Sequence, residues 1–145
     1  MSLKWTSLAA TAVLVLAVVG LYLEHALFAT QAWAIAVQGL AVLLMIWARL
    51  TFGARSFHAG ANPTGGGIVT TGPYWFVRHP IYAAILFGVW AGIASHPSVP
   101  AALVAAVASG AVAVRIACEE RLVIERYPEY REYAARTKRV LPFVI

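Results

Sequence analysis

The stretch GPYWFVRHPIY, residues 72–82, organises this chain, because it separates two apolar halves and brings together an Arg, a His and two Tyr. Pro80 suits the first turn of a helix, where a missing N–H has no cost. Arg78 and His79 are therefore predicted to lie at a helix N-terminus. Tyr82 follows them by four and three residues, so it projects on the same side. Free N–H groups and the helix dipole suit this corner to a carboxylate or another anion.

The composition indicates a membrane protein. The chain has 145 residues, of which 61% are hydrophobic and 12% charged, and its mean hydropathy is +0.77. Soluble domains carry about 25% charged residues. Asp is absent, which excludes mechanisms that need it, and five of the six Glu residues follow residue 115. The single cysteine, Cys118, excludes an internal disulfide or a thiolate metal site. No basic patch alternates with exposed aromatic residues, so a nucleic-acid partner is not expected. No bound metal is expected either.

Four apolar segments predict four transmembrane helices, at about residues 5–23, 31–48, 80–95 and 101–118. A span needs ~20 apolar residues, and the third segment is shorter than that. A signal peptide is the alternative for the first segment. Pro128 is expected to end the fourth helix, and a short helix is predicted from about Glu129 to Arg136. The predicted fold is a single all-α membrane-embedded domain over residues 1–145, with this short helix in the cytoplasm.

Polar residues outside the central stretch have simpler interpretations. His25 is expected to be an interfacial residue. Gln38, within the second apolar segment, is expected to form an interhelical hydrogen bond rather than a ligand contact. Arg55, His58 and the glycines at 65–67 predict a polar, flexible loop. The two side chains of this loop are expected to be interfacial rather than catalytic.

The distribution of basic residues predicts the orientation in the membrane. The connections at 24–30 and 96–100 contain no Lys or Arg, whereas the other side of a four-span arrangement contains all of them. The positive-inside rule then puts both termini and the loop 50–79 in the cytoplasm. The corner at 78–79 and the Glu pair at 119–120 should meet on that face and form one site. The alternative for the Glu pair is a plain interfacial ion-pair network with Arg115, four residues before Glu119.

The corner, the Glu pair and the C-terminal residues together form a recognisable pattern. Gly-Pro-Tyr-x-x-Val-Arg-His-Pro-x-Tyr is followed by two Glu and Leu122, then by Tyr130 and Tyr133, and finally by Lys-Arg-Val and Leu-Pro-Phe up to residue 143. This pattern, over about residues 65–143, resembles the isoprenylcysteine carboxyl methyltransferases and their bacterial relatives. Part of it is similar to the phospholipid N-methyltransferases.

The resemblance implies a membrane-embedded methyltransferase that uses S-adenosylmethionine without a soluble Rossmann domain. By motif, the residues implied to bind the cofactor are Arg78, His79, Tyr82, Glu119, Glu120 and Leu122. Arg139 and Glu119 are implied to be catalytic, with Arg139 holding the carboxylate of the acceptor, and Tyr130 and Tyr133 are implied to bind the substrate. The sequence departs from the pattern at Arg126-Tyr127-Pro128, where the eukaryotic enzymes have Phe-Gly. It also lacks a few residues between Val140 and Leu141.

The chemistry of methyl transfer leaves several acceptors open. Displacement at a sulfonium mainly requires that donor and acceptor be positioned. A carboxylate acceptor needs no base, whereas an amine or a thiol needs one, for which Glu119, Glu120 or His79 is the candidate. We expect carboxyl O-methylation of an isoprenylcysteine-like, lipophilic acceptor. Methylation of a phospholipid, a small amine or a thiol is one alternative, and a non-catalytic membrane packing module is another.

The expected setting follows from the same observations. The partners expected are a lipophilic or lipid substrate and the membrane lipids, around a monomer or a homodimer. The expected location is a bacterial inner membrane.

Overall fold

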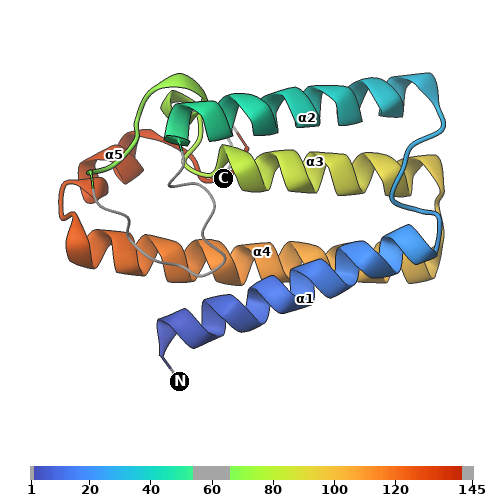
Figure 1. The fold of residues 1–145 in the computed structure, drawn as a ribbon, viewed down its shortest axis with the longest axis horizontal. Helices are drawn as coiled ribbons and strands as arrows, with labels where there is room; N and C mark the ends of the chain where they lie inside the picture. The colour runs from blue at the N-terminus through green and yellow to red at the C-terminus, as the bar shows by residue number, and fades with distance from the viewer. Residues whose placement is uncertain (1, 54–65, 142–145) are drawn as a thin grey trace.

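The computed structural model describes residues 2–53 and 66–141, so Arg55 and His58 lie outside the described residues. The described helices are α1 (Leu3–Leu23), α2 (Ala32–Phe52), the 3-10 helix η2 (Gly72–Trp75), α3 (Pro80–Ser95), α4 (Val99–Arg126) and α5 (Tyr130–Arg136). Figure 1 shows α1 beside α4 and α2 beside α3, with the short α5 at one end of this bundle. The predicted all-helical fold is confirmed.

Three of these helices are long and apolar enough to cross a membrane, namely α1, α2 and α4. The remaining long helix, α3, has 16 residues and is about 24 Å long, shorter than the ~30 Å of a bilayer hydrocarbon core. In contrast, α4 has 28 residues and is about 42 Å long. It continues well past the end of the predicted fourth span, which extends the helix through both glutamates of the 119–120 pair.

Prolines set the helix ends that the sequence predicts, and a serine cap that it does not predict begins α4. Pro80 lies in the first turn of α3. At the start of α4, the Ser98 side chain accepts a hydrogen bond from the backbone N–H of Ala101 at 3.2 Å. Arg126 is the last residue of α4, two positions before Pro128. α5 then begins within a residue of its predicted start.

Small residues form the contact faces between the paired helices. The buried residues of α2 are Ala34, Ala41 and Ala48, spaced seven apart along the face toward α3. The buried face of α1 follows the same repeat, with Ser7, Ala10, Leu14, Ala17 and Leu21. A repeat of seven is typical of helices that cross at about 20°, and small side chains let backbones approach in a membrane. The opposite faces carry exposed leucines, as expected for contact with lipid.

Gln38 forms the interhelical hydrogen bonds that its position predicts. Its Nε2 donates to the carbonyl oxygens of Leu27 at 2.7 Å and Gly88 at 2.9 Å. Its Oε1 accepts from the backbone N–H of Ala29 at 3.0 Å. One side chain therefore joins α2, α3 and the connection between α1 and α2. Gly92 of α3 lies against the same connection, and a Cβ at this position would come within 2.3 Å of the Leu27 carbonyl oxygen.

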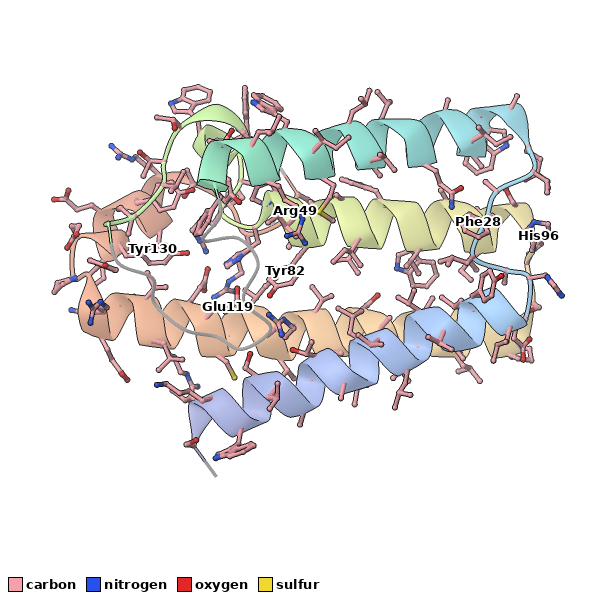
Figure 2. All side chains as sticks on the ribbon, in the orientation of Figure 1. Phe28, Arg49, Tyr82, His96, Glu119 and Tyr130 are labelled. Atoms are coloured by element: carbon pink, nitrogen blue, oxygen red, sulfur yellow. The ribbon has the colours of Figure 1, made fainter. Side chains whose placement is uncertain are left out.

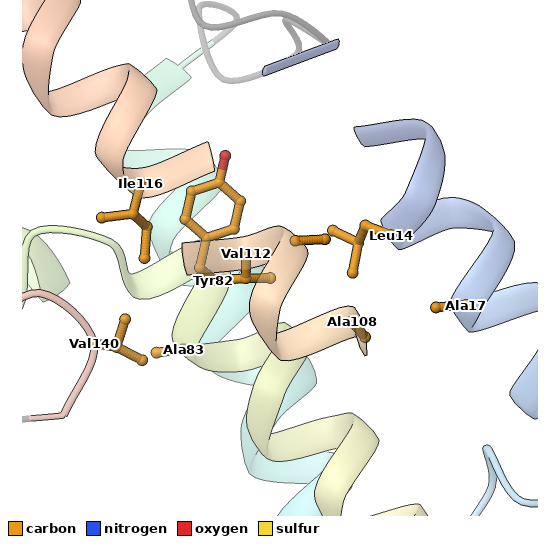
Figure 3. Packing of buried hydrophobic residues seen from close by; sticks show 9 residues of the cluster. Leu14, Ala17, Tyr82, Ala83, Ala108, Val112, Ile116 and Val140 are labelled. Carbon is orange, nitrogen blue, oxygen red and sulfur yellow. The ribbon is translucent and has the colours of Figure 1, made fainter. Parts of the chain in front are cut away.

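An apolar cluster supports the end of the bundle where α5 lies. It combines residues of α1, α3 and α4 with Val140, which follows α5, and Figure 3 shows Leu14, Ala17, Tyr82, Ala83, Ala108, Val112, Ile116 and Val140. The ring of Tyr82 packs in this cluster, so the hydroxyl of Tyr82 is held at its edge. This edge is where the polar residues of the molecule gather.

Candidate functional site

The two polar groups that the sequence predicts to converge do so at the end of the bundle. We define the polar cluster as the seven interacting side chains of Arg78, His79, Tyr82, Arg115, Glu119, Glu120 and Arg139. They come from the start of α3, from α4 and from the C-terminal segment, defined as residues 130–140. Figure 2 shows Tyr82 and Glu119 pointing toward each other between α3 and α4.

Glu120 is the more enclosed of the two carboxylates. Its Oε1 lies 2.8 Å from Nε of Arg78 and 3.3 Å from Nε2 of His79. Its Oε2 accepts from Nε of Arg139 at 3.0 Å. Because both oxygens are engaged and the side chain is only 10% exposed, Glu120 joins α4 to the start of α3 and to the C-terminal segment.

Glu119 has a different arrangement of contacts. Its Oε1 accepts from the Tyr82 hydroxyl and, at 2.9 Å, from Nη2 of Arg115. Its Oε2 lies 3.9 Å from Nδ1 of His79, which is beyond hydrogen-bond distance. Among the described residues, Oε2 accepts no hydrogen bond, and the side chain is 24% exposed. Glu119 is therefore the carboxylate with an oxygen still able to accept from a ligand.

Arg115 completes this arrangement from a buried position. Its Nε donates to the Tyr82 hydroxyl at 2.7 Å, so that hydroxyl accepts from Arg115 while it donates to Glu119. Its Nη1 lies 3.5 Å from the carbonyl oxygen of Ser7 in α1. The sequence interpretation left Arg115 out of the site, although its four-residue spacing from Glu119 signals the pairing. The contact to α1 has no signal in the sequence.

The C-terminal segment is held against the start of α3 by backbone hydrogen bonds. The N–H of Arg78 donates to the Lys138 carbonyl at 2.7 Å, and the N–H of His79 donates to the Arg139 carbonyl at 2.9 Å. Val77 and Lys138 form an isolated parallel bridge. These bonds engage two of the amides that the sequence analysis offered to an anion. The segment also brings the Arg139 side chain, which is 57% exposed, to the polar cluster.

The two tyrosines of α5, which is part of this segment, are buried rather than open to solvent. The Tyr133 hydroxyl donates to the Tyr74 carbonyl of η2, and the rings of Tyr130 and Tyr133 meet edge to face with centroids 5.5 Å apart. Burial raises the pKa of the Tyr133 hydroxyl to about 12 and also raises that of Tyr130. Both hydroxyls are neutral at physiological pH. Leu122 lies half-buried on α4, outside the polar cluster.

Comparison with known proteins places the chain among membrane methyltransferases. Residues 30–130 match the phospholipid methyltransferase family. The cobalt-zinc-cadmium resistance protein CzcN of Cupriavidus metallidurans is 34% identical over 105 residues, which are 71% of this chain and 44% of that protein. The nickel-cobalt-cadmium resistance protein NccN of Alcaligenes xylosoxydans xylosoxydans is 34% identical over 76 residues, which are 52% of this chain and 36% of that protein. The chain thus matches less than half the length of each relative. No solved structure matches it significantly.

The family match covers more than half of the chain and contains every residue of the polar cluster except Arg139. It bears out the broad resemblance seen in the sequence, to membrane methyltransferases. The chain belongs to the phospholipid methyltransferase family.

Proposed function

We propose that this protein is an S-adenosylmethionine-dependent methyltransferase that methylates a carboxylate on a lipophilic, isoprenylcysteine-like acceptor. The observation that carries the proposal is a contrast within the polar cluster. Glu120 is engaged through both oxygens, and the open oxygen of Glu119 is assigned to the methyl donor, whereas the terminal nitrogens of Arg139 have no partner among the described residues. That contrast favours an acceptor that is already an anion.

The residues present fit the methyl donor at Glu119. An unengaged carboxylate oxygen beside a buried network suits the ribose hydroxyls or the ammonium group of S-adenosylmethionine. His79 lies 3.9 Å from that oxygen through Nδ1 and would contact the same ligand. When bound, S-adenosylmethionine supplies a methyl group from a sulfonium centre. The Tyr82 hydroxyl and Arg115 hold one oxygen of Glu119 and so orient the other toward the donor.

Arg139 is suited to hold the acceptor. Its Nε donates to Glu120, and neither of its terminal nitrogens has a partner among the described residues. A guanidinium with two parallel donors binds a carboxylate in a defined orientation. The carboxylate oxygen is itself the nucleophile, so the protein has no proton to remove.

An amine acceptor fits the cluster less well because it requires a free base. His79 lies between both carboxylates, 3.3 Å from Glu120 through Nε2 and 3.9 Å from Glu119 through Nδ1. Glu120 is paired with two guanidinium groups. Such pairing stabilises the ionised carboxylate and makes it a weaker base. We therefore prefer carboxyl O-methylation to methylation of a phospholipid amine.

Exposed aromatic residues support a position of the site at the membrane surface. Trp5 at the start of α1, Trp47 near the end of α2 and Trp75 in η2 are between 48% and 68% exposed. All three belong to the end of the bundle that holds the polar cluster (Figure 1). Tryptophans concentrate at the level of lipid headgroups. A lipophilic acceptor could then keep its chain in the bilayer while its carboxylate reaches Arg139.

The proposed topology has four spans, because the short α3 crosses the membrane together with α1, α2 and α4. Both ends of the chain then lie on the cytoplasmic side of a bacterial inner membrane, where S-adenosylmethionine is available. The names of the two relatives refer to metal resistance. The described residues contain no group of three or more His, Cys, Asp or Glu side chains that could hold a metal ion. We therefore base the chemistry on the family and the polar cluster.

A labelled-methyl assay tests this function. The purified protein is incubated in micelles with methyl-labelled S-adenosylmethionine and either small prenyl thioether acids or phosphatidylethanolamine. Transfer to the acids should be released as volatile methanol by mild base, because a methyl ester hydrolyses and an N-methyl group does not. Base-stable label in the phospholipid, with none in the acids, would replace O-methylation by N-methylation. No transfer to either acceptor class would contradict the proposed activity on these lipophilic substrates.

A further inference from the structure

We propose that Arg78 is a positioning residue that holds the C-terminal segment in place and so determines the position of Arg139, rather than a ligand of the methyl donor. This inference rests on the proposed function and deepens it. It assigns Arg78 an indirect role in binding the methyl acceptor, through Arg139, instead of a direct role in binding the methyl donor.

The guanidinium of Arg78 is directed at α5 and Glu120. The side chain is only 8% exposed, and its Nε lies 2.8 Å from Oε1 of Glu120. Its Nη1 donates to the carbonyl of Ala134 at 2.9 Å and also to the carbonyl of Thr137. These carbonyls belong to the last turn of α5 and the residue after it, where a helix has unsatisfied acceptors and partial negative charge. Arg78 therefore acts as a C-terminal cap for α5.

A cap of this kind is important because α5 is short. The helix has seven residues, and isolated helices below about 12 residues are marginal in water. Its order must come from contacts with the rest of the molecule. Apart from Arg78, the Tyr133 hydroxyl supplies such a contact by donating to the Tyr74 carbonyl.

The backbone of Arg78 continues the same attachment toward Arg139. Its N–H donates to the Lys138 carbonyl at 2.7 Å, and the next N–H along, that of His79, donates to the Arg139 carbonyl at 2.9 Å. The side chain and the main chain of one residue thus hold both ends of the stretch that leads from α5 to Arg139. The groups that hold Glu119, in contrast, are Tyr82 and Arg115, neither of which contacts Arg78 through any hydrogen bond in the described residues.

The test compares R78Q with the matched control R121Q. R121Q also removes a guanidinium, but an exposed one, next to Glu120 in the chain. In R78Q, the KM for a prenyl thioether acid should rise at least tenfold, while the Kd for S-adenosylmethionine stays within threefold of wild type. R78K should be intermediate, because one ammonium cannot serve Glu120 and two carbonyls with the geometry of a guanidinium fork. R121Q should match wild type in both values.

Hydrogen exchange measured by mass spectrometry gives a readout that does not depend on activity. Amides of residues 131–139 should exchange at least tenfold faster in R78Q, with no change in the central turns of α4. If R78Q cannot be purified, R78K carries the same comparison, since it keeps the positive charge and removes the guanidinium fork that reaches α5.

The outcomes separate this inference from the proposed function. Faster exchange of residues 131–139 with no methyl transfer by wild type would support the positioning role and contradict the function. A tenfold loss of donor affinity in R78Q, with exchange of residues 131–139 unchanged, would overturn the inference and make Arg78 a donor ligand.

Discussion

Replacing Glu119 by Gln is expected to weaken binding of S-adenosylmethionine by about 10- to 30-fold, whereas replacing Glu120 by Gln should weaken it less than threefold. One oxygen of Glu119 is held by Tyr82 and Arg115, and the other accepts no hydrogen bond among the described residues. Both oxygens of Glu120 are already engaged within the protein. The two adjacent glutamates should therefore differ in their effect on the donor.

The magnitude follows from the change in charge at Oε2. Hydrogen bonds to a charged group contribute about 1.5–3 kcal/mol and neutral ones about 0.5–1.5 kcal/mol. Gln preserves the shape of Glu119 but replaces an anionic oxygen by a neutral amide. The expected loss is about 1.4–2 kcal/mol of binding free energy, and 1.4 kcal/mol is a factor of about ten in Kd. The Arg115 side chain keeps an amide oxygen as partner, so the helices should remain folded.

Isothermal titration calorimetry in detergent micelles measures this difference. S-adenosylhomocysteine is the second titrant, because it carries no methyl group to transfer. Circular dichroism of each variant shows whether the helices are retained. A Kd for E119Q within twofold of wild type would refute the reasoning, and so would an equal loss of affinity in E119Q and E120Q.

Three further predictions concern stability. Gly92→Ala should lower the melting temperature by about 3–10 °C, since overpacking costs about 1–3 kcal/mol and the new Cβ would lie 2.3 Å from a backbone oxygen. The control Gly110→Ala should change the melting temperature little, because a Cβ there would meet nothing within 4 Å. Gln38→Leu should cost about 2–3 kcal/mol of unfolding free energy, because two carbonyls and one N–H lose their partner. Thermal unfolding in detergent measures both. Burial raises the pKa of Tyr133 to about 12, so its contribution to stability should be complete below pH ~10, the ordinary pKa of tyrosine, and be lost as the pH rises through 12. Alkaline unfolding of Y133F should lack this component.

Much of the fold could be predicted because local chemistry sets the helix ends. Pro80 and Pro128 mark the start of α3 and the end of α4 by removing donors and restricting the preceding backbone. Gln38 could be assigned to helix packing because an amide in an apolar segment needs partners. The predicted fourth span ends at residue 118, and the charged residues after it continue the same helix to Arg126, close to the end that Pro128 predicts.

The convergence of the polar cluster could also be predicted, whereas the roles inside it could not. Basic-residue distribution put residues 78–79 and 119–120 on one face, and the structure brings them into contact. Sequence gave no means to separate Glu119 from Glu120, because the difference depends on which side chains face each oxygen. The contacts of Arg78 with α5 were equally hidden, since those acceptors are backbone carbonyls more than 50 residues away, and every residue has a carbonyl.

The most direct test of the central claim is the binding of S-adenosylmethionine to the wild-type protein. Equilibrium dialysis of the purified protein against labelled S-adenosylmethionine should show saturable binding of one molecule per chain in the micromolar range. Unlabelled S-adenosylhomocysteine should displace the label, and ATP, which shares the adenosine but lacks the amino acid group, should not. Absence of saturable binding up to millimolar concentrations, by a protein with intact helices, would contradict the assignment of the polar cluster as a methyl-donor site.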